Sequence, residues 1–240
     1  MPAPLFRRST ARIHDNSVRD ITINFPLYNS VKTVRIGLEE GALLSCSDGY
    51  TDKKPIVFYG SSITQGGCAS RPGNSYQALI SRRFNIDYFN FGFSGNALGE
   101  KTMADYIAAL PMSLFFLDFD HNSPNAEHLK AHHESFFLNI REKNPDLPVI
   151  MATKTDIPRS PAAEKSNAAH RAVVYETYEN AVTRGDRNVI FIDGATVFSK
   201  ALTLSAPADS CTVDGCHPND LGFACMAKVF GDAIEKMLVL

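Results

Sequence analysis

Three side chains of this sequence have the types needed to activate an oxygen nucleophile: Ser62, Asp214 and His217. Ser62 follows the apolar run IVFY, and Asp214 and His217 lie three residues apart in the loop DGCHPND, where Asn219 or Asp220 would cap the last helix. A serine hydroxyl needs a base to take its proton, and the base needs a carboxylate to orient it. We therefore interpret Ser62 as a nucleophile, His217 as its base and Asp214 as the orienting group. Taken singly, each motif equally fits an ordinary turn or helix cap.

Two further loops offer groups that can stabilise a negatively charged oxygen. NFGFSGNALGE contains Gly95, whose backbone amide is a hydrogen-bond donor, and LDFDHNSPN contains Asn122, whose side chain carries an amide. Donors of this kind form oxyanion holes in acyl-transfer enzymes. The alternative interpretations are a loop glycine that satisfies backbone torsions and a turn asparagine before Ser123 and Pro124.

The elements that must position these loops alternate regularly along the chain. Short apolar runs predict strands at 56–59, 86–91, 113–119, 148–153 and 188–193, and helix-period segments predict helices at 75–83, 99–110, 125–143, 162–183 and 219–237. Runs too apolar to face water, separated by helices, indicate a parallel sheet covered on both faces. The sequence thus predicts an α/β fold, a three-layer α/β/α arrangement around a central parallel sheet of about five strands. Ligand sites in such sheets lie beyond the carboxyl ends of the strands, where the four loops fall.

The amino-terminal part of the sequence has a different pattern of apolar and polar residues. ITINFPLYNSVKTVRIGLEEGALL, residues 21–44, alternates apolar and polar residues, with turn signals at Pro26, Asn29 and Gly41. This pattern predicts two or three antiparallel strands, too few for an independent sandwich. We therefore expect residues 1–50 to form a short β appendage and residues 51–240 to form the main domain.

Composition limits the classes of function. The 240 residues are 44% hydrophobic and 21% charged, with a formal net charge of −2 and a pI near 6.4, which argues against nucleic-acid and membrane partners. No apolar run has the roughly 20 residues of a spanning helix. No secretory signal is apparent in this chain, so we expect a cytoplasmic protein, with a periplasmic or secreted location left open. The five cysteines are interpreted as reduced thiols, with a Cys211–Cys216 disulfide as the alternative.

The four loops together resemble those of the SGNH (GDSL-like) hydrolases, whose marker residues are a serine, a glycine, an asparagine and a histidine in this order. The stretches YGSSITQGGCASRPG, GFSGN and DGCHPNDLGFACMA are most similar to a bacterial branch with an amino-terminal β-sandwich of the GxDLY type, and FPLYNSVKTVRIGLEEGA resembles the end of that sandwich. The resemblance covers nearly all of residues 20–240 and implies a flavodoxin-like fold. Two departures are Asp120, His121, Asn122 and Ser123 in place of the usual third block, and the absence of most of the sandwich.

The resemblance also implies roles for individual residues. Ser62 would be the nucleophile, its amide, that of Gly95 and the side chain of Asn122 would form the oxyanion hole, and His217 and Asp214 would complete the triad. The implied activity is hydrolysis of a carboxylic ester through an acyl-enzyme, without metal or organic cofactor. A short acyl group, acetyl, on a carbohydrate or another small molecule is the expected substrate, and a homo-oligomer is left open.

Three alternatives and two secondary residues complete the sequence-based hypotheses. The chain could be an inactive carbohydrate-binding protein of the same fold, or a lipase or thioesterase for longer acyl chains. Arg71 and Ser61 are candidates for the substrate-binding pocket. A metal hydrolase is disfavoured because no glutamate base is placed as in HExxH. Its candidate ligands would be Asp118, Asp120, His121, His128, His132 and His133.

Overall fold

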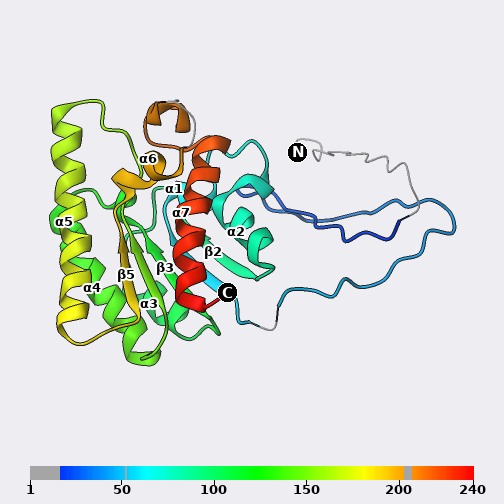
Figure 1. The fold of residues 1–240 in the computed structure, drawn as a ribbon, viewed down its shortest axis with the longest axis horizontal. Helices are drawn as coiled ribbons and strands as arrows, with labels where there is room; N and C mark the ends of the chain where they lie inside the picture. Colours follow the sequence, from blue (N-terminus) through cyan, green and yellow to red (C-terminus); the bar gives the residue numbers. More distant parts are fainter. Residues whose placement is uncertain (1–16, 52, 203–206) are drawn as a thin grey trace.

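A computed structural model describes residues 17–51, 53–202 and 207–240 of the chain. Its centre is a five-stranded, wholly parallel sheet in the order β2-β1-β3-β4-β5 (Figure 1). The strands are β1 (Ile56–Gly60), β2 (Tyr88–Gly92), β3 (Leu114–Asp118), β4 (Val149–Ala152) and β5 (Val189–Ile192). The sequence-based prediction of an α/β fold with about five parallel strands is confirmed.

Seven α-helices connect and follow these strands in the described part of the chain. The predicted helices correspond to α2 (Tyr76–Phe84), α3 (Lys101–Ala108), α4 (Ala126–Lys143), α5 (Pro161–Thr183) and α7 (Asp220–Leu238). Two short helices were not predicted, α1 (Ser62–Gln65) and α6 (Val197–Ala201). Four 3₁₀ turns, η1 (Pro72–Asn74), η2 (Asp120–Asn122), η3 (Gly194–Thr196) and η4 (Ala208–Cys211), lie in the connections.

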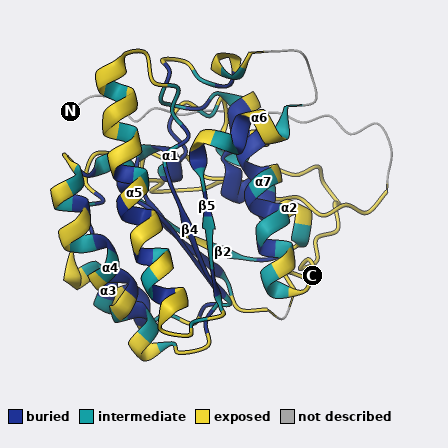
Figure 2. Cartoon of the chain, turned by 60° about the vertical axis from the view of Figure 1, so that its left-hand side comes forward, coloured by how far each residue is buried: buried dark blue, intermediate teal, exposed yellow. Residues whose placement is uncertain are grey.

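The helices cover the sheet on both faces because its strands are apolar on both faces. Alternate residues of a strand point to opposite sides, so Val57 and Tyr59 pack with α3, α4 and α5, whereas Ile56 and Phe58 pack with α2, α6 and α7. The central strands β1, β3 and β4 are wholly buried, whereas the edge strands β2 and β5 are only partly buried. Figure 2 shows the sheet between helices whose outer sides are exposed. This double burial explains why the central strands read as continuous apolar runs.

The strand order creates the place where the site forms. From β1 the chain crosses to β2 at one side, and the next strand, β3, lies on the other side of β1. The carboxyl ends of β1 and β3, on either side of this reversal, are the usual ligand position in open α/β sheets. Ser62 follows β1, Gly95 follows β2 and Asn122 follows β3, so three predicted site residues surround this position.

The predicted amino-terminal strands are not formed: no strand is assigned among described residues 17–51. The predicted turn at Gly41 is present, with a left-handed φ of 81°. However, the apolar side chains of this segment face solvent, with Val18 95% and Leu43 98% exposed. Two or three strands without a covering layer cannot bury such a face, which explains the correction. We call residues 17–50 the amino-terminal arm; Figure 1 shows it projecting from the α/β body. The division at residue 50 stays a prediction.

Over the part of the chain that the structure describes, no helix has the length and apolar character needed to cross a bilayer.

Candidate active site

Ser62 lies at the sharp turn between β1 and α1. Gly60 must be glycine there, because a Cβ at this position would lie 2.1 Å from the carbonyl oxygen of Asp118 and 2.1 Å from Oγ1 of Thr64. The hydroxyl of the buried Ser61 caps α1 by accepting a hydrogen bond from the Ile63 amide. The next residue, Ser62, is partly exposed. Ser61 thus supports the turn, and Ser62 presents its hydroxyl at the carboxyl end of the sheet.

Asp214 and His217 lie in a short closed loop before α7. The amide of Val213 donates to the carbonyl of His217 over 2.9 Å, and Asn219 caps α7 through a hydrogen bond from the Gly222 amide. One carboxylate oxygen of Asp214 accepts the amides of Cys216 and His217 at 2.8 and 2.7 Å. These hydrogen bonds fix the carboxylate relative to the imidazole. We call residues 212–218 the triad loop.

The three predicted catalytic side chains are in contact in the structure. Oγ of Ser62 lies 3.0 Å from Nε2 of His217, and Nδ1 of His217 lies 2.8 Å from Oδ2 of Asp214. The hydrogen bond from the His217 side chain, together with those from the loop amides, outweighs the effect of burial and lowers the pKa of Asp214 to about 2. An ionised Asp214 can only accept, so Nδ1 of His217 carries the hydrogen. In the neutral ring Nε2 is then an acceptor for the hydroxyl of Ser62, which is the arrangement a general base requires.

The predicted oxyanion residues, Gly95 and Asn122, lie in the loops that follow β2 and β3, the two strands beside β1. Gly95 has a left-handed φ of 71°, and a Cβ built there would meet no atom within 4 Å, so open space lies beside it. The side-chain amide of Asn122 donates to the carbonyl of Phe93 over 2.8 Å. This bond ties η2 to the loop of Gly95 and leaves the second hydrogen of the Asn122 amide available for a ligand.

The two secondary candidates differ in position. Ser61 is wholly buried and caps α1, so its side chain is structural. Arg71 is exposed before η1, and its charge helps to lower the pKa of Asp220 after the hydrogen bonds from Ser70 and Asn74. Among the described residues, no hydrogen bond or ion pair joins Arg71 to the triad. The structure therefore brings neither side chain into contact with the triad.

The amino-terminal arm contributes residues that the sequence analysis did not assign to the site. The hydroxyl of Tyr28 donates to the backbone carbonyl of Ser62 over 3.2 Å. The side chain of Gln65 donates to the carbonyl of Leu27 at 3.2 Å and accepts the amide of Ser94, next to Gly95, at 2.9 Å. The arm thus braces both the nucleophile turn and the glycine loop. No short-range sequence pattern predicts these contacts, because each joins two residues that are between 29 and 38 positions apart in the chain.

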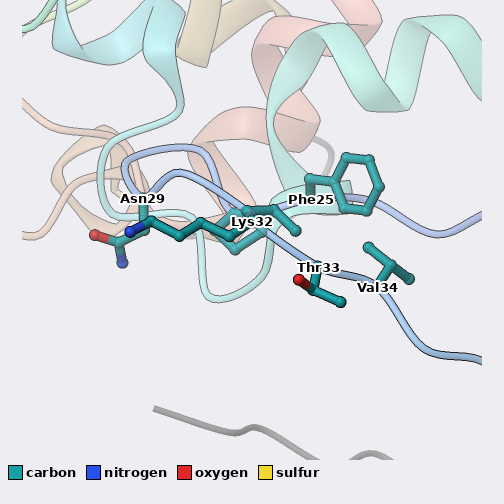
Figure 3. A pocket seen from close by; sticks show the side chains of 7 residues that line it. Phe25, Asn29, Lys32, Thr33 and Val34 are labelled. Atoms are coloured by element: carbon teal, nitrogen blue, oxygen red, sulfur yellow. The ribbon is translucent and has the colours of Figure 1, made fainter. Parts of the chain in front are cut away.

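A hollow in the arm itself does not include the triad. It is lined by residues of the arm, among them Phe25, Asn29, Lys32 and Val34 (Figure 3). None of the catalytic or oxyanion candidates belongs to its lining.

The six candidate metal ligands do not converge as a group. Asp118, Asp120 and His121 lie together at the end of β3. In contrast, the rings of His128 and His132 stack on each other with centroids 4.2 Å apart on α4. The side chain of His133 is buried against Thr177 at 2.9 Å.

Burial and neighbouring groups shift the pKa values of Asp118 and His121, which lie at the end of β3. It raises the pKa of Asp118 to about 8, despite hydrogen bonds from Thr64 and Tyr76 and the nearby His121. Burial alone would lower the pKa of His121, but Asp156, Cys216 and the charge of Asp120 reverse the effect and raise the pKa to about 10.

All five cysteines are free thiols in the structure, and Cys211 and Cys216 are not joined.

Comparison with known proteins places the chain in a family. Residues 53–235 match the model of the GDSL-like Lipase/Acylhydrolase family. Over 78% of this chain and 54% of the other, the structure is similar to that of a protein from Bacteroides ovatus ATCC 8483 described as a GDSL-like lipase, with 34% identity and a TM-score of 0.69. No curated protein matches the chain.

More distant solved structures share the fold. One is a salicylyl-acyltransferase from a tetracycline biosynthetic pathway, with 24% identity, a TM-score of 0.67, and 85% of this chain and 59% of that one covered. Another is a family two carbohydrate esterase from Clostridium thermocellum, with 16% identity, a TM-score of 0.59, and 80% and 66% covered. The chain spans little more than half the length of the first two of these three structures. The family match and the 34% identical structure together show that the chain belongs to the GDSL-like lipase/acylhydrolase family of hydrolases.

Proposed function

We propose that this hydrolase is a serine esterase that removes a short acyl group, acetyl, from a carbohydrate or another small alcohol. The observation that carries the proposal is the continuous hydrogen-bonded series from Asp214 through His217 to Ser62, with separations of 2.8 and 3.0 Å. This is the arrangement that converts a serine hydroxyl into a nucleophile.

In the first half of the reaction, Oγ of Ser62 attacks the ester carbonyl and its proton passes to Nε2 of His217. The amides of Ser62 and Gly95 and the side chain of Asn122 stabilise the resulting oxyanion. Collapse of the tetrahedral intermediate breaks the bond to the alcohol, which leaves with the proton from His217. The acyl group is then bound to Ser62.

In the second half, a water molecule takes the place of the alcohol. His217 removes a proton from this water, which attacks the acyl-enzyme, and the second tetrahedral intermediate releases the carboxylic acid. The proton returns to Ser62, so one ester and one water give one acid and one alcohol. Asp214 remains ionised and orients His217 throughout.

The choice of a short acyl group rests on the accessibility of the site. The side chains of His217 and Asp214 are 33% and 50% exposed, and Ser62, the first residue of α1, is itself partly exposed. Long acyl chains need an extended apolar surface to bury them. Two fold neighbours are an esterase active on acetylated mannans and an acetyl-xylooligosaccharide esterase, which makes acetylated oligosaccharides the first substrates to test.

The test combines covalent labelling with turnover. Wild-type protein, Ser62→Ala and the matched control Ser135→Ala, an exposed serine on α4, are treated with a fluorophosphonate and analysed by intact-mass spectrometry. We expect one adduct and hydrolysis of p-nitrophenyl acetate in the wild type and the control, and neither in Ser62→Ala. Retained turnover in Ser62→Ala would refute the nucleophile. Sugar binding without any adduct would support the carbohydrate-binding alternative, and faster turnover of octanoate than of acetate esters would support a lipase or thioesterase.

A further inference from the structure

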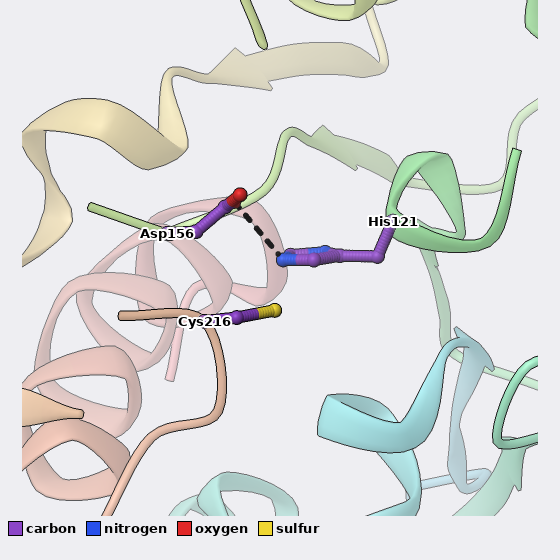
Figure 4. A group of neighbouring side chains, drawn as sticks. All are labelled: His121, Asp156 and Cys216. Carbon is purple, nitrogen blue, oxygen red and sulfur yellow. Dashed lines mark ion pairs between the residues drawn. The ribbon is translucent and has the colours of Figure 1, made fainter. Parts of the chain in front are cut away.

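Three side chains from three separate loops converge beside the triad loop. His121 comes from η2 after β3, Asp156 from the segment after β4, and Cys216 from the triad loop itself (Figure 4). One nitrogen, one oxygen and one sulfur atom of this group lie within 4.8 Å of one another. The closest pair is Nε2 of His121 and Oδ1 of Asp156, at 3.2 Å. We call these three residues the HDC cluster.

The HDC cluster contains buried polar atoms that lack hydrogen-bond partners. The side chain of His121 is 9% exposed, and neither of its ring nitrogens has a partner of acceptable geometry among the described residues. Oδ1 of Asp156 also has none, although it lies within hydrogen-bond distance of the ring. Figure 4 shows the ring and the carboxylate facing each other across this ion pair, with the sulfur atom of Cys216 beside them. Because the contact lacks hydrogen-bond geometry and buried polar atoms without hydrogen bonds are costly, a ligand held between the three groups would stabilise the cluster.

We propose that His121, Asp156 and Cys216 bind a divalent transition-metal ion, with zinc as the best fit. Imidazole nitrogen, carboxylate oxygen and thiolate sulfur are the three ligand types that zinc uses in proteins, and a water molecule can take the fourth tetrahedral position. Ligand atoms about 2.0–2.3 Å from one tetrahedral ion lie about 3.3–3.8 Å from each other. The 3.2 Å between Nε2 of His121 and Oδ1 of Asp156 is close to this spacing, and the sulfur atom of Cys216 lies within 4.8 Å of a nitrogen of His121 and an oxygen of Asp156.

A fourth residue has the position of an outer-shell partner. Oδ1 of Asp120, also buried without a hydrogen bond among the described residues, lies 3.7 Å from Nδ1 of His121. A histidine that binds a metal through one nitrogen commonly donates the other N–H to a carboxylate, which fixes the ring. The charges also balance, because a neutral imidazole, one carboxylate and one thiolate offset a divalent ion. Binding releases the thiol proton of Cys216 and the extra proton of His121.

The site would connect the triad loop to the loops after β3 and β4. Cys216 lies between Asp214 and His217 in the sequence, and the amide of Ile157 already donates to the carbonyl of Gly215 over 2.7 Å. The ion would add a second connection between the same two segments. Its role is structural: no step of the proposed ester hydrolysis passes through it, and His217 keeps its contact with Ser62.

The first experiment measures metal content and affinity. The wild type, freed of metal and titrated with zinc against a chromophoric chelator, should bind about one zinc per chain. We expect His121→Asn, Asp156→Asn and Cys216→Ser to weaken zinc binding at least tenfold, and Asp120→Asn to weaken it about 10–100-fold. Cys68→Ser and His132→Asn, a thiol and an imidazole outside the HDC cluster, serve as matched controls and should retain the wild-type affinity.

A second experiment on the wild type does not depend on the folding of the cluster variants. Cobalt(II) in place of zinc should give visible d–d bands and a near-ultraviolet thiolate-to-cobalt charge-transfer band, and Cys216→Ser should lose the latter. Absence of stoichiometric binding and of this band in the wild type would overturn the proposal, leaving the cluster as a protonated ion pair. Equal zinc affinity in Cys216→Ser would also overturn it. Ser62→Ala should bind zinc normally, so a failure of the esterase proposal is distinguishable from a failure of the metal site.

Discussion

The hydroxyl of Tyr28 donates a hydrogen bond to the backbone carbonyl of Ser62 over 3.2 Å. Through this bond a residue of the amino-terminal arm lies directly on the nucleophile turn. The neighbouring Leu27 carbonyl accepts from Gln65, so the arm is attached at two adjacent points. The segment expected as a separate appendage therefore also takes part in positioning the site.

Tyr28→Phe removes this hydroxyl and keeps the ring. A neutral hydrogen bond contributes about 0.5–1.5 kcal/mol, so we expect kcat/KM for p-nitrophenyl acetate to fall about 2–13-fold if the bond is needed to hold Ser62. The decrease should lie mainly in kcat, because the acetyl ester does not need the lost hydroxyl for binding. Tyr175→Phe, an exposed tyrosine on α5, is the control. Equal kcat/KM values in the two variants would show that Tyr28 does not position the nucleophile.

Asp214→Asn tests the orienting carboxylate. The change removes the acceptor that keeps the hydrogen on Nδ1 of His217, so we expect kcat to fall about 10²–10⁴-fold, in line with the effect of the same change in serine protease triads. Because the pKa of Asp214 is about 2, its carboxylate is ionised above pH 4. Any loss of wild-type activity between pH 7 and pH 4 would therefore not come from protonation of Asp214. Steady-state kinetics across this range measures both effects, with Asp209→Asn as control. Activity within twofold of the wild type in Asp214→Asn would exclude the role.

Asn122→Ala tests the oxyanion hole. The side-chain amide would stabilise charge that develops only in the transition state, so we expect kcat to fall about 10²–10³-fold with little change in KM. Asn122→Asp should be worse still, because it places a negative charge beside the oxyanion. The control is Asn180→Ala on α5, because the side chain of Asn180 donates a hydrogen bond to Glu134 and has no assigned role in the site. A rise in KM at constant kcat would instead make Asn122 a ground-state binding residue.

Local patterns were sufficient to predict the α/β body. β1 and β3 are buried on both faces, and nearly all their residues are therefore apolar, which makes these strands recognisable in the sequence. The pairing of Ser62 with His217 was also predictable, because their residue types fit a nucleophile and its base and Ser62 follows a buried strand. Its distance of 3.0 Å, in contrast, depends on the packing of loops 155 residues apart.

Local sequence patterns did not predict the structure of the amino-terminal arm or the presence of the HDC cluster. Alternation around Ile21–Phe25 predicted strands, but strand formation depends on a pairing partner and a covering layer that residues 17–50 do not supply among themselves. The HDC cluster was missed because Asp156 and Cys216 lie outside any compact ligand motif and meet His121 through tertiary folding alone. The hypothesis of a metal hydrolase singled out His121 but combined it with histidines on α4 that face elsewhere.

His133 should make the folded protein sensitive to acid. Burial lowers its pKa to about 3, whereas a histidine in an unfolded chain titrates near pH 6.5. Between these values the unfolded state binds a proton that the folded state does not, so the free energy of unfolding falls as the pH falls through this window. His133→Gln removes the titration, and the slope of that free energy against pH, measured by urea denaturation, should decrease by up to about 1.4 kcal/mol per pH unit. Thr177→Val removes the hydrogen-bond partner of the ring but keeps the imidazole, and should retain the steep slope. An unchanged slope in His133→Gln would assign the acid sensitivity to other groups.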